Sequence, residues 1–357
     1  MDKESSIDAW LGEIGILEHK SKLSLDGKLI RFSRNPMKPK NESAWLVGYA
    51  HNFGRDRVYK TIVFGDWATG EKVTYTSKFR GSALEKKKIG KLISQIRDTE
   101  LREREQFEKD SSEKATWIFS QCVESEHPYL RRKQVSSFGT KVSNYKDLNS
   151  LVVPVYNFKG QIMGLQFIPE GGIKKFLPGT QKKGNFFQIG DLSEKTKTVF
   201  VSEGFATGAS AHMATELPVF VAFDSGNLVS VASQLRDRYP EIVIVIAGDD
   251  DRSNPQNPGR KKALEAAKEV KGCAVFPVFT EEESNYSDFN DLHVSHGLER
   301  VKECINGQID RFENRIKGAL STLSVFSIFF DSGEVQKLGK AELEALDLLE
   351  NRLPTSF

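Results

Sequence analysis

The alternation of apolar and polar residues changes its period along the chain, most clearly within residues 197–278. Short runs of consecutive apolar residues alternate there with segments of helical period. The runs predict strands at 198–202, 218–223, 242–247 and 274–278, and the segments between them predict helices at 207–215, 228–238 and 259–271. Apolar strands joined by helices are typical of a parallel sheet that is covered on both faces. We therefore expect an α/β domain built on a parallel four-stranded core sheet.

The N-terminal part of the chain follows the two-residue period of strands instead. A short helical pattern at 7–17 precedes strand-like segments within 31–77, which Gly, Asp and Asn turns separate. This pattern predicts a small antiparallel β module. Its aromatic residues are expected in the packing more than in base stacking: Trp45, Tyr49, Tyr59, Trp67 and Tyr75.

Two further segments have helical patterns. Residues 82–122 predict a helix whose charged second half is solvated, with a flexible joint near Lys109–Ser112. After Leu292 the pattern is mostly helical, and "GKAELEALDLLENRL" predicts an amphipathic helix. Its apolar side carries Leu343, Leu346, Leu349 and Leu353. That helix either caps its own core or docks a helicase or another replication protein.

The segment between these helices, residues 127–190, is again rich in strand patterns, with a hairpin turn at Lys159-Gly160. The whole pattern predicts five parts, which are a β-rich module at 1–80, a helical linker at 81–112, a basic α+β subdomain at 113–196, the α/β domain at 197–312 and a helical segment at 313–357.

Charge is distributed unevenly over these parts, although the formal net charge is only +2. Residues 127–190 hold ten Lys or Arg and two acids, whereas residues 201–310 hold ten basic and eighteen acidic residues. A polyanion bound by the basic segment and metal ions bound by the acidic one would explain this distribution. Two solvated faces of opposite sign would explain it equally well.

Some classes of protein are excluded by the sequence. No apolar run is long enough to span a bilayer and no N-terminal apolar signal region is present, so we expect a cytoplasmic protein without a membrane partner. Cys122, Cys273 and Cys304 lie far apart without CxxC spacing. A zinc ribbon is therefore excluded, and a disulfide framework is not expected.

Acidic residues follow three of the predicted strands. Glu203 follows the first, Asp224 the second, and Asp249, Asp250 and Asp251 the third. In an open parallel sheet, ligands bind beyond the carboxyl ends of the strands, so these acids are expected at one edge. Residues i and i+2 of an extended chain point the same way, which allows Asp249 and Asp251 to share a divalent cation while Asp250 turns aside. Carboxylates suit Mg²⁺ or Mn²⁺; alternatively, Asp250 and Asp251 solvate a loop and cap the next helix.

The stretches "SEGFATGAS", "VAFDSGNL" and "IAGDDDRSNPQNPG" resemble the TOPRIM domain shared by bacterial primases, topoisomerases and some nucleases, and especially primases of plasmids and phages. The resemblance implies that Glu203, Asp249 and Asp251 are catalytic and hold metal. "SDFNDLHVSHG" is similar to a further acidic motif of this group, which adds Asp288 and Asp291 as metal ligands. A helix cap is the alternative role of Asp288 and Asn290.

The segment before the α/β domain resembles the basic subdomain that precedes TOPRIM in bacterial primases. The resemblance assigns Lys175 and Lys183 to nucleotide or DNA binding, with Lys174 and Lys182 beside them. Further residues expected to contact nucleotide or DNA are Arg131, Arg132, Asp224, Asn227 and Arg260. Ordinary surface charge is the alternative for the arginines. A zinc-binding domain and a GxxxxGK[ST] phosphate loop are both missing from this sequence.

The resulting hypothesis is a DNA primase that makes short RNA primers on single-stranded DNA from nucleoside triphosphates, for a plasmid, a phage or another mobile element. It would use Mg²⁺ or Mn²⁺ without zinc, and a separate replicative helicase as a possible partner. Two alternatives stay open, which are a metal-dependent TOPRIM nuclease and a catalytically silent accessory factor that binds nucleic acid.

Overall fold

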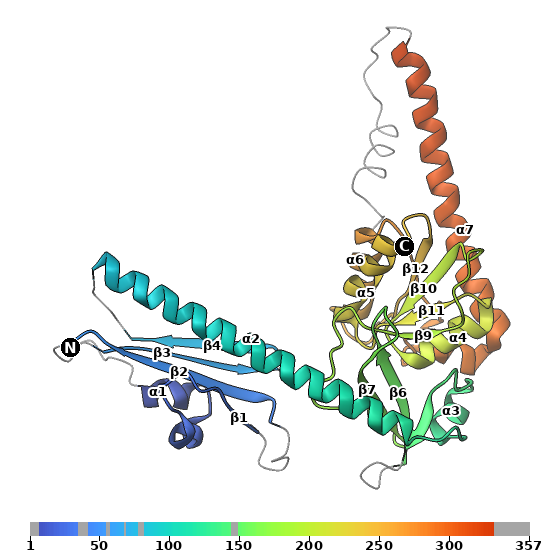
Figure 1. Cartoon of the computed structure of the whole chain (residues 1–357). Helices are drawn as coiled ribbons and strands as arrows, with labels where there is room; N and C mark the ends of the chain where they lie inside the picture. Colours follow the sequence, from blue (N-terminus) through green and yellow to red (C-terminus); the bar gives the residue numbers. More distant parts are fainter. Residues whose placement is uncertain are drawn as a thin grey trace. The chain divides into compact units, whose positions relative to one another are not determined.

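The computed structural model describes residues 7–34, 42–54, 58–67, 69–77, 82–143 and 149–331. The chain divides into two compact units, one comprising 1–116 with 176–180 and the other 117–175 with 181–357 (Figure 1). The five-part division predicted from the sequence stays a prediction. No helix among the described residues is both long and apolar enough to cross a membrane.

The first unit is built on an antiparallel sheet, as the two-residue period predicts. Its strands are β1 (Ile30–Phe32), β2 (Ala44–Asn52), β3 (Val58–Asp66) and β4 (Glu71–Thr76), in the order β1-β2-β3-β4. The helix α1 (Ile7–Glu13) and the 3₁₀ turn η1 (Leu17–Lys22) precede them. Alternate residues of β2 enter two different apolar clusters, Leu46 with Trp10 of α1 and Trp45 with Ile96 of a later helix. Both faces of the sheet are therefore covered.

That later helix is α2 (Ala83–Ser120), which extends from the first unit into the second. In the first unit Trp67 stacks on Phe107 with ring centroids 5.1 Å apart, and the guanidinium of Arg31 lies 4.0 Å from the Phe107 ring. The joint expected near Lys109–Ser112 does not interrupt the helix, because α2 continues through these residues.

The second unit contains the α/β domain. Its sheet has five strands in the order β13-β12-β10-β11-β9, which are β9 (Phe187–Ile189), β10 (Thr198–Ser202), β11 (Val219–Val221), β12 (Val243–Ala247) and β13 (Cys273–Val275). The four predicted strands are parallel as expected. The fifth, β9, pairs antiparallel with β11, so the sheet is mixed rather than purely parallel. Without β9 the backbone groups of β11 would form an unpaired edge.

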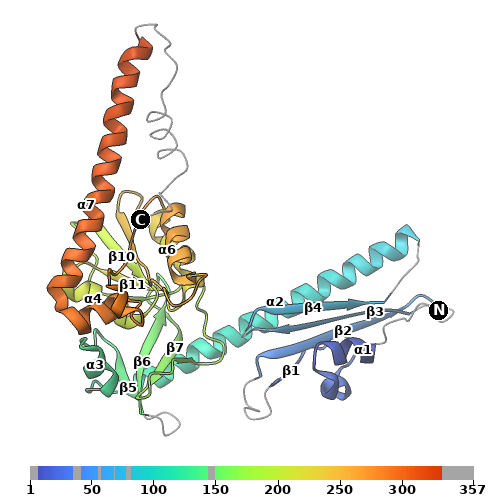
Figure 2. The same ribbon diagram turned by 180° about the vertical axis from the view of Figure 1, so that it is seen from behind.

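Helices cover both faces of this sheet (Figures 1 and 2). The helices α5 (Leu228–Arg238) and α6 (Pro258–Glu269) pack on the face that carries Val199 and Ile244. The opposite face carries α4 (Phe205–Thr215) and the first part of α7 (Phe289–Asp331). The helical C-terminus is thus confirmed as far as Asp331, and the amphipathic helix expected around Leu343–Leu353 lies outside the described residues.

A second, smaller sheet belongs to the basic segment. Its order is β5-β6-β7-β8, from β5 (Lys141–Ser143), β6 (Ser150–Tyr156), β7 (Ile162–Pro169) and β8 (Lys175–Phe176), and the short helix α3 (Pro128–Lys133) precedes it. The hairpin between β6 and β7 turns at Lys159-Gly160 as predicted, with Gly160 at φ 74°. Asn157 stabilises the turn, because its side-chain oxygen accepts from the backbone N–H groups of Lys159 and Gln161.

The close approach of α4 to the sheet gives a stability prediction. A Cβ on Gly208 would lie 2.6 Å from the Ser202 hydroxyl oxygen and 3.1 Å from side-chain carbons of Val219 and Val221. Gly208→Ala should therefore lower the free energy of unfolding by about 1–3 kcal/mol, the usual cost of overpacking. Gly307→Ala in α7 is the matched control, since nothing lies within 4 Å of its added Cβ. It should gain about 0.5–1 kcal/mol from helix propensity. Urea unfolding measures both, and equal effects would contradict the packing.

Candidate active site

The strand ends that carry the acids are level with one another. Ser202, the last residue of β10, pairs with Val221 on one side and with Ala247 on the other. The predicted acids follow these ends, which are Glu203 after β10, Asp224 after β11 and Asp249 after β12. Because the strands are parallel, the acids converge at one edge of the sheet, as the sequence predicts.

Asp249 follows β12 and lies next to Glu203 at this acidic edge. Burial raises its pKa well above the ordinary value, and the charges of Asp288, Glu203 and Asp251 raise it further. Its Oδ1 atom is buried and has no hydrogen-bond partner among the described residues. A buried carboxylate oxygen without a donor is costly, and a cation would relieve that cost.

Glu203 and Asp288 take part in the same electrostatic cluster. Burial is the largest cause of the raised pKa of each carboxyl, and the next cause is opposite in sign for the two. The charge of Lys174 lowers the pKa of Glu203, whereas the charge of Asp291 raises the pKa of Asp288. The cluster therefore joins acids from the ends of β10 and β12 and from the start of α7.

The three consecutive aspartates have three different surroundings. Asp250 is buried, accepts a 2.7 Å hydrogen bond from the Asn257 side chain and forms a 3.4 Å ion pair with Arg260. Asp251 accepts a 3.0 Å hydrogen bond from the N–H of Gly259 at the start of α6. Asp250 thus turns aside as predicted, and Asp251 accepts from the first turn of α6, whose N-cap residue is Asn257.

Gly259 is required for this arrangement. A Cβ there would lie 2.8 Å from the Asp251 carboxylate and 3.0 Å from the backbone oxygen of Asp249. The side chain of Arg260 is directed to Asp250 and lies over Phe276, with 4.2 Å between the guanidinium and the ring centroid. Its described partners are therefore protein groups, and nucleotide binding by Arg260 stays a prediction without support from these contacts.

The motif around Asp288 forms the start of α7. Asp288 Oδ1 accepts from the N–H of Asp291 at 2.7 Å, and Asp291 Oδ2 accepts from the N–H of Ser287 at 3.0 Å. Lys133 of α3 pairs with Asp291 at 3.6 Å. The helix-cap role considered for Asp288 is therefore present, and its charge still acts on Asp249.

Buried polar residues next to Asp288 hold this helix start in place. Asn290 donates to the backbone oxygen of Lys133 at 2.7 Å and to the Ser210 hydroxyl at 3.0 Å. Ser210 in turn hydrogen-bonds to His293 at 3.1 Å. This network joins α7 to α4 and to the end of α3. The i, i+3 spacing of Asn290 and His293 on the predicted helix was the available signal.

Tyr129 was missed in the sequence. It is 3% exposed, and burial followed by the charge of Asp288 raises its pKa to about 12. Arg132 lies over its ring at 5.6 Å. Together with Lys133 these residues have the i, i+3, i+4 spacing of one face of α3. That face is turned to the acidic edge, which the sequence "PYLRRK" could have indicated.

The predicted lysines form two pairs, Lys174 with Lys175 and Lys182 with Lys183. In each pair one lysine lies near the acids and the other does not. The charge of Lys174 acts on Glu203, Asp249 and Asp288, and its Nζ would lie 3.4 Å from a Cβ on Gly204. Lys175 has no such interaction among the described residues, as expected when neighbours in an extended chain point to opposite sides. The lysine at the acids is thus Lys174, one position before the residue that the resemblance assigns.

In the second pair, Lys182 forms a 2.6 Å ion pair with Asp224, and Lys183 is exposed. Asn227 is 4% exposed, and its side chain hydrogen-bonds to backbone groups of the segment 182–185. The structure therefore brings Lys182, Asp224 and Asn227 together. Both polar ends of the Asn227 amide are engaged within the protein, so the contact with nucleotide or DNA expected of this residue is not supported by the geometry.

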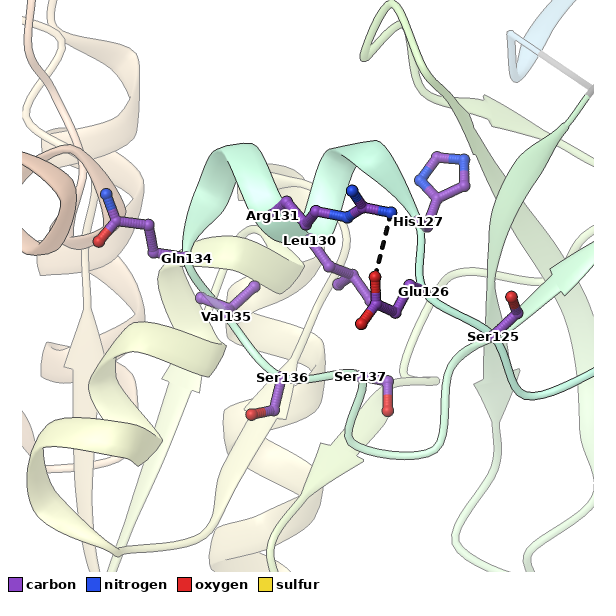
Figure 3. A pocket seen from close by; sticks show the side chains of 9 residues that line it. All are labelled: Ser125, Glu126, His127, Leu130, Arg131, Gln134, Val135, Ser136 and Ser137. Atoms are coloured by element: carbon purple, nitrogen blue, oxygen red, sulfur yellow. Dashed lines mark ion pairs between the residues drawn. The ribbon is translucent and has the colours of Figure 1, made fainter.

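The two arginines of α3 point to different places. Arg131 forms a 3.0 Å ion pair with Glu126 and lines a cavity of about 530 Å³ (Figure 3). The nine lining residues lie within 125–137, and no residue of the acidic edge is among them. Arg132 donates a 3.0 Å hydrogen bond to the backbone oxygen of Glu170, in the turn that leads to Lys174. Arg132 thus adjoins the site, whereas Arg131 does not.

The acids do not form a complete metal cage by themselves. Within the part of the chain that the structure describes, no three His, Cys, Asp or Glu side chains are arranged to coordinate one ion. Mg²⁺ commonly takes one or two carboxylates, and substrate phosphate and water supply its other ligands. The unpartnered oxygen of Asp249 and the neighbouring Glu203 carboxylate fit such a partial donor set.

An acidic edge at the ends of three parallel strands, with lysines beside it, is the arrangement that the comparisons with known proteins can test. Residues 198–299 match the family described as the Toprim domain. The chain is 29% identical over 352 residues to one DNA primase TraC of Escherichia coli and 33% identical over 231 residues to another. These matches take in 90% and 61% of this chain but 32% and 16% of the two relatives. The predicted resemblance to TOPRIM-domain primases is confirmed.

Solved structures give weaker likenesses. The Aquifex aeolicus primase, with its zinc-binding and RNA polymerase domains, is 14% identical with a TM-score of 0.42, and 89% of each chain is covered. The primase fragment of the bacteriophage T7 primase-helicase is 15% identical with a TM-score of 0.40, covering 52% of this chain and 80% of that one.

The three aspartates should differ in their effect on stability. The fold raises the pKa of Asp249, so ionising this carboxyl lowers the free energy of unfolding. This loss is absent below the ordinary pKa of an aspartate and is complete once the pH has risen through the raised pKa. Asp249→Asn should therefore raise the melting temperature at neutral pH in EDTA by about 2–4 °C per kcal/mol relieved. The gain should shrink as the solution is acidified.

Asp250→Asn is the matched control, since it breaks the pair with Arg260 and should lower the free energy of unfolding by about 1–3 kcal/mol. Differential scanning calorimetry compares the two variants. A lower melting temperature for Asp249→Asn at neutral pH would contradict the assigned burial of charge.

Proposed function

We propose that the chain is a DNA primase, which joins nucleoside triphosphates into short RNA primers on single-stranded DNA by metal-dependent nucleotidyl transfer. The observation that carries the proposal is the acidic edge of the α/β domain, where Asp249 has a buried oxygen to which no described residue donates, beside Glu203 and Lys174. The likeness to two proteins named DNA primase supports it. Because the chain spans a third or less of those relatives, the activity is proposed for this chain and not transferred from them.

The donor set fits Mg²⁺ or Mn²⁺. Asp249 and Glu203 would hold the ion, with Asp251 and Asp288 as further acids that act on Asp249 and with Asp291 beside Asp288. When bound, a divalent ion supplies charge stabilisation for the transferred phosphoryl group. Glu203 has a pKa raised by burial, which suits it to take the proton from an attacking hydroxyl near neutral pH.

The basic residues provide for the phosphates of nucleotide and template. Lys174 already lies within electrostatic reach of the acids, and Lys182 pairs with Asp224 beside them. Lys175, Lys183 and Arg131 are exposed and would act on the template backbone. Counterion release then makes the affinity for single-stranded DNA fall as salt rises. A separate helicase as partner and an origin in a mobile element stay predictions from the resemblance.

The test is oligonucleotide synthesis from labelled nucleoside triphosphates on unprimed single-stranded DNA, in Mg²⁺ and in Mn²⁺. The unmodified chain should make short RNA, and Asp249→Asn or Glu203→Gln should reduce the rate by about 100-fold or more, because each removes a charge that the reaction uses. Glu194→Gln is the control, since Glu194 is exposed and lies outside the site.

Two outcomes would overturn the proposal. Cleavage of the DNA that depends on Asp249 would favour the nuclease, and salt-sensitive binding without synthesis or cleavage would favour the accessory factor. Synthesis that survives both substitutions would place the chemistry elsewhere in the chain.

A further inference from the structure

The segment Lys182–Asn185, called here the lysine loop, is held by one side chain from the acidic edge. The Asn227 side-chain oxygen accepts from the N–H of Gly184 at 2.7 Å. Its Nδ2 donates to the backbone oxygens of Lys182 at 2.8 Å and Asn185 at 3.0 Å, and to that of Ala222 at 2.9 Å. Asn227 therefore ties both ends of the lysine loop to the end of β11.

A second contact, from α5, fixes the middle of the loop. Gln234 donates to the backbone oxygen of Gly184 at 2.8 Å. Gly184 has φ 73°, and a Cβ there would lie 2.1 Å from the Gln234 side-chain nitrogen. Only glycine meets both the left-handed conformation and the close approach. The backbone of the lysine loop is thus set by the α/β domain.

The third contact concerns the charge that the loop carries. Lys182 Nζ lies 2.6 Å from Asp224 Oδ2, and these side chains are 39% and 38% exposed. A pair so open to water contributes little to stability. Asp224 interacts electrostatically with Glu203, so the ammonium of Lys182 lies next to the acidic edge and in reach of solvent. Its carboxylate partner has the charge and the oxygen geometry that a phosphate would bring.

We propose that Asn227 is a positioning residue for the lysine loop, whose contact with phosphate the resemblance already implies, and that Asp224 holds the Lys182 ammonium until a phosphate group takes its place. The inference deepens the proposed function, because the phosphate belongs to a nucleoside triphosphate or to the DNA backbone. It also gives Asp224 and Asn227 roles other than contact with the ligand.

The two residues should then affect phosphate binding in opposite directions. Asn227→Asp replaces the amide group that donates to three backbone oxygens by a carboxylate oxygen, which cannot donate. The lysine loop then loses these hydrogen bonds, and the affinity for phosphate should fall by about tenfold or more. Asp224→Asn removes the competitor for Lys182, so binding tightens by about two- to fivefold. In a Lys182→Met background, Asp224→Asn should lose this effect, because it acts through the lysine.

The experiment measures the dissociation constants of ATP and, separately, of a single-stranded oligothymidylate, together with hydrogen exchange of residues 182–185. The ligand that responds identifies the source of the phosphate. Asn227→Asp should speed the exchange of the Gly184 amide. Gln188→Glu is the matched control, since Gln188 donates to the backbone of Gly190 outside the loop and its change should leave both readouts unaltered.

Three results would overturn the inference. They are an unchanged affinity for both ligands in Asn227→Asp, a weaker affinity in Asp224→Asn, and an effect of Asp224→Asn that persists without Lys182. None of these readouts requires primer synthesis. If the unmodified chain made no RNA, the proposed function would fail, while the affinities and the exchange would still decide the role of the loop.

Discussion

Like charge gathered at the ends of buried strands is the constraint on which the rest of the second unit depends. Because β10, β11 and β12 end level, Glu203, Asp224 and Asp249 are brought close together by backbone pairing alone. Water cannot solvate all of them there, and burial is the largest cause of the raised pKa of both Glu203 and Asp249. Donors and cations of the surrounding structure stabilise most of these closely spaced carboxylates.

This stabilisation takes a different form for each carboxylate. Asp250 is neutralised by Arg260, and Asp251 accepts a hydrogen bond from Gly259 in the first turn of α6. Asp288 and Asp291 cap α7, with Lys133 beside them. The Oδ1 atom of Asp249 has no such partner among the described residues. The protein therefore satisfies the other acids with its own donors, whereas no described residue donates to this oxygen of Asp249.

The hydrophobic pattern predicted those helices and strands well whose ends are set by residues close by in the sequence. The strand 198–202 and the helix 228–238 match the structure residue for residue, because each is a short apolar or amphipathic segment between turn residues. The convergence of the acids followed from the parallel order of the strands. The strand β9 was missed as part of this sheet, because "GNFFQIG" has a strand pattern but nothing in it specifies its pairing partner.

The site was predicted less completely, for reasons that lie in tertiary packing. Lys174 and Lys175 are equivalent in sequence, and only the direction of the chain before β8 decides which one reaches the acids. Asn227 was expected at the ligand, but its partners are backbone groups about forty residues earlier in the chain. The link from Asn290 through Ser210 to His293 joins residues some eighty positions apart. No periodicity records such contacts.

The fifth strand, β9, has a consequence for which segments of this chain recombination can exchange. β9 lies in the basic segment, yet it completes the edge of the Toprim sheet, and the lysine loop directly before it is bound by Asn227 and Gln234. A recombination event that joined a foreign sequence at residue 197 would remove the edge strand β9 from the sheet. The start of the family match at residue 198 is therefore not a domain boundary of the fold, because β9 and the lysine loop before it pack on the domain that follows.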